Sequence, residues 1–126
     1  YQAYTETGMY GYRIDRYKDL LKVYTEDVDN AGTFIPDSIE AVYDPAPLHD
    51  VVSWLDEYGD NFIYIYGEGD AWSATAYTPT SKTNSVKLVQ KGGAHGVRIG
   101  SLSEKQKSIV FKKLSEWMEM EVPVRD

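Results

Sequence analysis

The stretch 62–72, Phe-Ile-Tyr-Ile-Tyr-Gly-Glu-Gly-Asp-Ala-Trp, decides the fold. Its first five residues are β-branched or aromatic and end at Gly67, which predicts a short strand buried on both faces of a parallel sheet. A second strand is predicted over residues 86–89, and Gly92 and Gly93 close it. Strands of this kind among helices predict part of a parallel α/β sheet.

Helical spacing precedes the strands twice. Apolar residues at i, i+3, i+4, i+7 and i+11 from Tyr17 predict a helix over 17–28, with Asp15 as its N-terminal cap and residues 30–32 as its end. A second helix is predicted over 48–58, with Gly59 as a left-handed C-terminal cap. The aromatic and glycine-rich residues 1–12 follow neither periodicity, and we expect a loop or a short extended segment there.

The last helix has the clearest start signal. Ser103 and Gln106 have the spacing of a capping box, in which each side chain satisfies a backbone N–H of the other residue. The apolar face of this helix is predicted to consist of Ile109, Val110, Leu114, Trp117 and Met118.

The length of 126 residues allows one domain with a modest core. Two parallel strands need further neighbours to complete their hydrogen bonding, so we expect the chain to be incomplete as a domain. The chain also begins at Tyr1 without a methionine, which we interpret as a processed or excised product.

Charge and composition exclude several classes of partner. Thirteen Lys and Arg residues against twenty Asp and Glu residues give a formal net charge of −7. The basic residues form no stripe that could neutralise a row of phosphates, so we expect no nucleic-acid partner. No apolar run approaches the length of a membrane span, and we expect no membrane partner. The chain has no cysteine, which excludes disulfides and thiolate zinc sites.

Two chemically useful side chains follow the two predicted strands. Asp70 lies in the turn after the first strand, and His95 lies in the turn after the second. Carboxyl ends of parallel strands meet at one edge of a sheet, so we expect the two turns to be neighbours. An acid that orients and stabilises an imidazole base makes up two thirds of a serine-hydrolase triad, and the order acid then histidine is that of α/β-hydrolases.

Each residue also has a simpler interpretation. An aspartate after a strand often bonds the backbone of its own turn, and a glycine-flanked histidine is often an ordinary loop residue. The nucleophile elbow Gly-x-Ser-x-Gly is absent from the 126 residues. We interpret the serines nearest the two turns, Ser73, Ser101 and Ser103, as helix-capping or turn residues.

Cofactor and metal sites find little support. Gly67 and Gly69 resemble the start of a dinucleotide fingerprint, but Trp72 stands where the third glycine belongs, so we expect no cofactor. No known metal-ligand spacing occurs, and we expect no metal site. The residues that could in principle supply metal ligands are Asp44, His49, Glu68, Asp70 and His95. We expect His49 to be a structural or exposed residue of the second helix.

The sequence resembles the secreted bacterial serine tripeptidyl aminopeptidases. The C-terminal third of that family reads roughly as an apolar strand, Tyr-Gly-x-x-Asp-x-Trp, a second strand and Gly-x-His-Gly-x-Arg-Ile. The matching segments here are Tyr66-Gly67-Glu68-Gly69-Asp70-Ala71-Trp72 and Gly93-Ala94-His95-Gly96-Val97-Arg98-Ile99. The segment from Gln2 to Gly8 also resembles the Gln-x-x-Thr-Glu-x-Gly segment of the family, so the resemblance spans nearly the whole chain.

The resemblance implies a fold, an activity and roles for three residues. It implies an α/β-hydrolase with a helical cap, in which residues 1–59 lead from the cap to the sheet and residues 60–126 hold the last two strands and the C-terminal helix. Asp70 is then the triad acid and His95 the general base. Glu6 would bind the free amino terminus of a peptide substrate, or would equally well anchor a loop through backbone amides.

The implied parent enzyme releases short peptides from free amino termini and is secreted or periplasmic. Its nucleophile and oxyanion hole lie outside these residues, so we expect this chain alone to be inactive and to need the N-terminal part of the same protein. Two alternatives stay open at this stage. One is another α/β-hydrolase such as an esterase, and the other is a non-catalytic, acidic, tyrosine-rich binding module.

Overall fold

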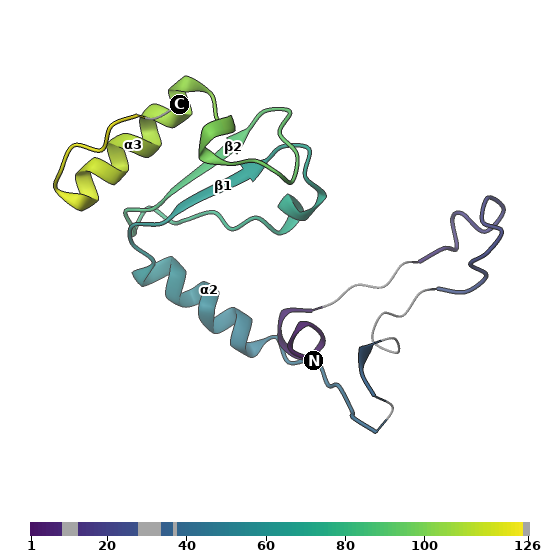
Figure 1. The fold of residues 1–126 in the computed structure, drawn as a ribbon. Helices are drawn as coiled ribbons and strands as arrows, with labels where there is room; N and C mark the ends of the chain where they lie inside the picture. The colour runs from purple at the N-terminus through teal and green to yellow at the C-terminus, as the bar shows by residue number, and fades with distance from the viewer. Residues whose placement is uncertain (9–12, 28–33, 37, 125–126) are drawn as a thin grey trace. The chain divides into compact units, whose positions relative to one another are not determined.

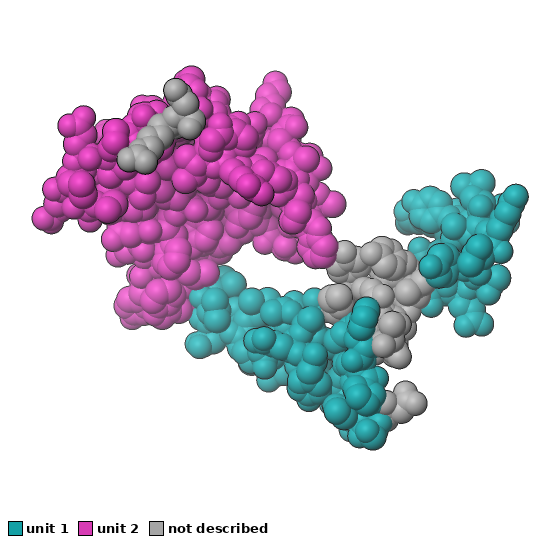
Figure 2. Space-filling model, in the orientation of Figure 1, with its two compact units in different colours: residues 1–52 teal, residues 53–126 magenta. Residues whose placement is uncertain are grey.

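The structure is a computed structural model that describes residues 1–8, 13–27, 34–36 and 38–124 of the chain. It divides into two compact units, residues 1–52 and residues 53–126 (Figure 2). Among the described residues, no helix has both the length and the apolar character needed to cross a bilayer.

The N-terminal unit contains little regular structure. A short π-helix, η1 (Ala3–Thr7), replaces the loop predicted for the start of the chain, and Thr5 within it is buried. The carbonyl oxygen of Thr5 accepts a 2.7 Å hydrogen bond from the backbone N–H of Asp44. The rest of the predicted loop, residues 9–12, lies outside the described residues.

The helix predicted over 17–28 is wrong for the residues that can be described. Residues 15–20 form turns and residues 21–27 form bends or irregular backbone, while Val28 and residues 30–32 lie outside the described residues. Asp15 caps no helix; instead Oδ1 of Asp27 accepts a 2.8 Å hydrogen bond from the N–H of Ile14 and closes a loop. The apolar side chains of this stretch that the structure describes are exposed, with Leu20 78% exposed. A helix this short is marginal without packing of its apolar face.

The helix predicted over 48–58 is confirmed as α2 (Ala46–Tyr58). Its start is fixed by Oδ1 of Asp44, which accepts a hydrogen bond from the N–H of Ala46 at 2.9 Å. Gly59 is not the left-handed cap that we predicted. Its N–H still donates to the carbonyl oxygen of Leu55, and the left-handed residue is Asn61, with φ of 62°. Asparagine tolerates this conformation, so the reversal comes two residues later than expected.

Two parallel strands form the centre of the C-terminal unit, as predicted (Figure 1). Strand β1 (Ile63–Gly67) pairs with β2 (Val86–Gln90) in a register that places Ile63 beside Val86 and Gly67 beside Gln90. The fold class is therefore α/β with a parallel pair of strands. Both strands run toward the same edge, where the turns that carry Asp70 and His95 begin.

One face of the strand pair packs against the C-terminal helix, α3 (Glu104–Met118). The predicted capping box is confirmed, since Ser103 accepts from the backbone N–H of Gln106 and Gln106 accepts from that of Ser103. Val110 is fully buried, but Met118, predicted on the same face, is 58% exposed. The core and the side chains packed against it are Leu88, Leu102, Val110, Ile63, Ile65, Val86, Val97, Ile109 and Leu114.

The opposite face of β1 carries Tyr64 and Tyr66, as the alternation of a strand requires. The segment after the first turn returns across this face: the Tyr77 ring lies 5.1 Å from that of Tyr64, centroid to centroid, and the N–H of Tyr77 donates to the Tyr66 hydroxyl. The β1 residues before Gly67 are nevertheless only half-buried. Burial on both faces was thus predicted too strongly, because β1 has no second neighbour within the described residues.

Candidate active site

The first turn places Asp70 at the start of a short 3-10 helix. After β1 the chain passes through Glu68 and Gly69, and Asp70 then caps η2 (Ala71–Thr75). Oδ1 of Asp70 accepts a 3.1 Å hydrogen bond from the backbone N–H of Trp72. The carboxylate is therefore oriented by its own turn, and its second oxygen stays available.

The second turn lies directly beside the first because hydrogen bonds link their backbones. The N–H of Glu68 donates to the carbonyl oxygen of Gln90 at 3.0 Å, and the N–H of Gly69 donates to that of Gly93 at 2.8 Å. Gly92 turns the chain with φ of 67°, a conformation that favours glycine. The predicted neighbourhood of the two turns is confirmed.

Asp70 and His95 form a hydrogen-bonded pair. Nδ1 of His95 lies 2.9 Å from Oδ2 of Asp70. An ionised carboxylate can only accept, so this bond places the imidazole proton on Nδ1 and leaves the lone pair on Nε2. Within the described part of the chain no hydrogen bond reaches Nε2.

Burial differs between the two partners. The Asp70 side chain is 13% exposed and the His95 side chain is 77% exposed. The hydrogen bond from His95, followed by that from the Trp72 N–H, lowers the pKa of Asp70, although partial burial opposes the shift. The acid is thus held ionised next to an imidazole whose outer edge faces away from the protein.

An aromatic ring lies beside the pair. The Trp72 indole is tilted by 45° to the His95 imidazole, with 6.4 Å between the ring centroids. The Trp72 N–H on Asp70 is the bond that the simpler interpretation of this aspartate predicts, so Asp70 both closes its own turn and pairs with His95. One contribution of this turn was not predicted from the sequence: Oε2 of Glu68 accepts from the Gly92 N–H at 2.8 Å.

Two of the three nearby serines, Ser101 and Ser103, have the structural roles that the sequence indicated, and Ser73 does not. Ser103 caps α3, and Oγ of Ser101 accepts from the Arg98 N–H and closes η3 (Ile99–Ser101). Ser73 lies within η2 rather than at its cap, and its buried hydroxyl makes no hydrogen bond to the described residues. Within the described chain no serine hydroxyl is hydrogen-bonded to His95.

Glu6 belongs to the other compact unit. Its Oε2 accepts a 2.9 Å hydrogen bond from Nε2 of Gln2, one helical turn earlier. This bond orients the carboxylate within η1 and leaves its role in substrate binding a prediction. His49 lies in α2, as expected, and the described residues contain no group of three or more metal-ligating side chains placed to hold an ion.

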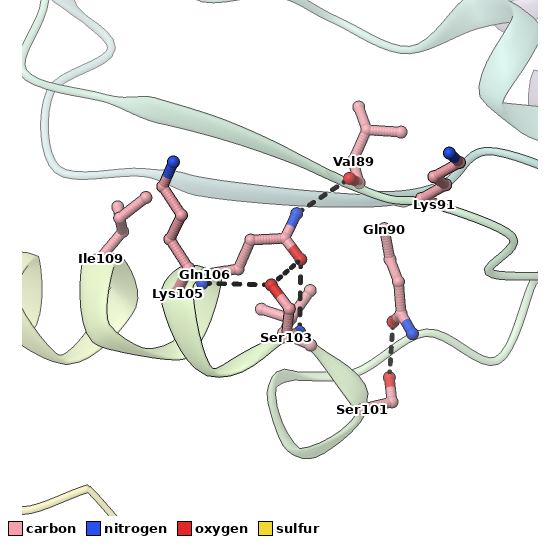
Figure 3. A pocket seen from close by; sticks show the side chains of 9 residues that line it. Val89, Gln90, Lys91, Ser101, Ser103, Lys105, Gln106 and Ile109 are labelled. Carbon is pink, nitrogen blue, oxygen red and sulfur yellow. Dashed lines mark hydrogen bonds between the residues drawn. The ribbon is translucent and has the colours of Figure 1, made fainter.

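A pocket lies between the end of β2 and the start of α3 (Figure 3). Its polar side chains are engaged in the local structure: Nε2 of Gln106 donates to the Val89 carbonyl, and the Ser101 hydroxyl donates to Gln90. The two lysines that line it, Lys91 and Lys105, are exposed. These hydrogen bonds hold the start of α3 against the end of β2. Neither Asp70 nor His95 lines the pocket.

Comparison with known proteins gives the class of this chain. Residues 1–124 match the family described as PS-10 peptidase S37, and the chain belongs to that peptidase family. A similar protein is the prolyl tri/tetrapeptidyl aminopeptidase of Streptomyces mobaraensis, which is 22% identical over 120 residues. The match covers 93% of this chain but 25% of the relative, so the chain spans about a quarter of the relative's length. No solved structure matches.

Proposed function

We propose that this chain supplies the acid and the general base of a serine exopeptidase that releases short peptides, such as tripeptides, from free amino termini. Asp70 is the acid and His95 is the base. The observation that carries the proposal is the 2.9 Å bond between Nδ1 of His95 and Oδ2 of Asp70, at the edge where both parallel strands end. Membership of a peptidase family supports a peptide substrate.

The geometry accounts for one proton transfer. Asp70 holds the proton on Nδ1, and Nε2 of His95 then accepts a proton from the attacking hydroxyl. The resulting imidazolium is stabilised by the ionised carboxylate beside it. The lowered pKa of Asp70 supports this role, because the acid stays charged across the neutral range.

The nucleophile and the oxyanion donors belong, in this proposal, to the part of the peptidase that corresponds to the rest of the longer relative. Exposed apolar side chains support a large intramolecular partner. Helix α2 buries none of its residues within the chain, and Val51, Trp54 and Tyr58 on it are exposed. We propose that this partner completes an α/β-hydrolase sheet beside β1, and that the enzyme acts outside the cytoplasm.

The proposal is tested in the complete peptidase that carries this chain. His95→Ala is expected to lower kcat on tripeptidyl chromogenic substrates by about 10⁴-fold or more, and Asp70→Asn by about 10³ to 10⁴-fold. His49→Ala changes a histidine on α2 outside the two turns and should retain turnover. Unchanged turnover in His95→Ala would refute the assignment of the base.

A substrate panel separates the remaining alternatives. The complete peptidase should hydrolyse tripeptidyl substrates in preference to single aminoacyl substrates and short-chain esters. Faster turnover of the esters would favour an esterase, and no turnover of any substrate would favour a binding module. Titration of the 126-residue chain alone with a fluorophosphonate should give no labelling, and stoichiometric labelling would show that the chain carries its own nucleophile.

A further inference from the structure

Glu68 links the two turns that carry Asp70 and His95. Its backbone N–H donates to the Gln90 carbonyl at 3.0 Å, and its carboxylate Oε2 accepts from the Gly92 N–H at 2.8 Å. One residue of the first turn thus binds both the last residue of β2, Gln90, and the turn that follows it, at Gly92. The Gly69–Gly93 hydrogen bond joins two backbone groups, whereas the bond from the Gly92 N–H is accepted by the Glu68 side chain. A substitution of Glu68 can therefore remove this link between the two turns.

The carboxylate of Glu68 has no competing partner. Glu68 forms no ion pair within the described residues, and its second oxygen is not used in a hydrogen bond there. A hydrogen bond from a backbone N–H to a charged carboxylate is stronger than one between neutral groups. The simplest role for the Glu68 carboxylate is therefore the contact that the structure shows, the hydrogen bond that it accepts from the Gly92 N–H.

The consequence lies three residues further along the chain. The His95 side chain is 77% exposed, so little packing restrains the imidazole and its position depends on the backbone that leads to it. Gly92 opens that backbone in a left-handed conformation, with φ of 67°, and no atom would contact a Cβ placed on it. Glycine has more backbone freedom than any other residue, so a hydrogen bond from the Gly92 N–H to Glu68 restricts the backbone where this turn begins.

We propose that Glu68 is a positioning residue for the His95–Asp70 pair, which it keeps within hydrogen-bond distance by binding the Gly92 N–H. Its catalytic consequence rests on the function proposed above, whereas the positioning does not. A positional error of about 1 Å in a catalytic group can cost about 10²-fold in rate, so a residue outside the pair can have a large effect. The other interpretation is an exposed glutamate that supports the turn without affecting the pair.

The first experiment measures the pair in the complete peptidase by NMR of ¹⁵N-labelled histidine. The proton on Nδ1 of His95 should give a protected signal that Asp70→Asn abolishes. Glu68→Met keeps the length of the side chain but has no oxygen acceptor, and we expect it to weaken this signal strongly. Glu68→Gln retains an amide oxygen for the Gly92 N–H and should restore it.

Two further variants make the first experiment decisive. Glu57→Ala removes another exposed glutamate, on α2 and outside both turns, and should leave the signal unchanged. Glu68→Ala repeats the loss of the acceptor with a different side chain, and circular dichroism confirms that each variant is folded. An unchanged Nδ1 signal in folded Glu68→Met or Glu68→Ala would overturn the proposal.

The second experiment measures turnover in the complete peptidase. Glu68→Met should lower kcat by about three- to tenfold with little change in KM, and Glu68→Gln should recover most of the loss. The pH profile of kcat should shift in Glu68→Met and return in Glu68→Gln, which a loss of stability alone would not produce. Wild-type kcat and pH profile in Glu68→Met would overturn the catalytic consequence.

The two proposals fail in different ways. If Glu68→Met loses the Nδ1 signal while His95→Ala keeps full turnover, the positioning is correct and the proposed function is wrong. If His95→Ala is inactive while Glu68→Met keeps the wild-type signal and kcat, the function holds and the positioning role of Glu68 is wrong.

Discussion

Gly67, the last residue of β1, lies against the backbone of Gly93 in the turn that follows β2. A Cβ placed on Gly67 would come within 2.6 Å of the Gly93 carbonyl oxygen and within 2.6 Å of that of Ala94. Both contacts are with backbone, which has no flexible side chain to move aside. The two strand ends can approach this closely only because residue 67 has no side chain.

Replacement of Gly67 tests whether this approach holds the pair together. Gly67→Ala should lower the free energy of unfolding by about 1–3 kcal/mol, since the methyl group has no room. It should also separate Asp70 from His95, measured as loss of the Nδ1 proton signal. Gly96→Ala is the matched control, because a Cβ there meets no atom within 4 Å. Equal stability of Gly67→Ala and wild type in urea would contradict the structure.

The core of the C-terminal unit depends on Val110. This side chain is fully buried against Leu88 and Leu102. Val110→Ala should reduce the free energy of unfolding by about 2 kcal/mol, from lost burial of two methyl groups and the cavity that remains. Met118→Ala on the same helix removes a side chain that is 58% exposed and should change it by less than about 0.5 kcal/mol. Similar urea midpoints for both variants would be inconsistent with this core.

Tyr77 gives the C-terminal unit a dependence on alkaline pH. Partial burial, together with the 2.8 Å hydrogen bond from its hydroxyl to Asp56, raises the pKa of Tyr77 from 10.0 to about 12. A raised pKa in the folded state means that the stabilisation is complete below pH 10.0 and is lost as the pH rises toward 12.

Unfolding experiments between pH 8 and about pH 11 check this dependence. Wild type should be more stable than Tyr77→Phe at the lower pH, and the difference should shrink as the pH passes 10.0. Tyr58→Phe serves as the control, because the Tyr58 hydroxyl makes no hydrogen bond to the described residues. A constant difference between wild type and Tyr77→Phe across this range would refute the raised pKa.

The elements predicted correctly are those whose signals are local. Helix α3 starts where Ser103 and Gln106 satisfy each other's backbone N–H groups, and those bonds need only four consecutive residues. The run that ends at Gly67 has the composition of a strand, and parallel pairing follows from the length of the connection to β2. The proximity of Asp70 and His95 was predictable from this parallel pairing, because the carboxyl ends of parallel strands lie at the same edge of the sheet.

The elements predicted wrongly depend on what surrounds them. The spacing from Tyr17 to Tyr24 is helical, but its apolar side chains are exposed, with Leu20 78% exposed. Instead, the backbone N–H of Ile14 donates a hydrogen bond to the Asp27 side chain, which closes this stretch into a loop. Glu68 was missed as a positioning candidate because its contact to Gly92 crosses 24 residues of sequence, and no pattern within one turn reveals it.

The hydrogen bond between Asp70 and His95 also predicts an acid-dependent loss of stability. This bond lowers the pKa of Asp70 below its ordinary value of 3.8. A lowered pKa in the folded state contributes stability that is fully present above pH 3.8 and is lost as the pH falls through the lower, folded value. Asp70→Asn removes the titrating group, so wild type should lose its advantage over this variant only in that acid window.

Two measurements on the complete peptidase check this prediction together. Carboxyl ¹³C NMR should show Asp70 titrating below 3.8 in wild type, and closer to 3.8 in His95→Ala. Two opposing influences on the pKa of Asp70 remain in His95→Ala: burial, which raises it, and the hydrogen bond from the Trp72 N–H, which lowers it. His49→Ala should leave the Asp70 titration unchanged. An Asp70 pKa that is the same in wild type and in His95→Ala would show that the imidazole does not hold the carboxylate in solution, and would remove the main physical support for His95 as the base.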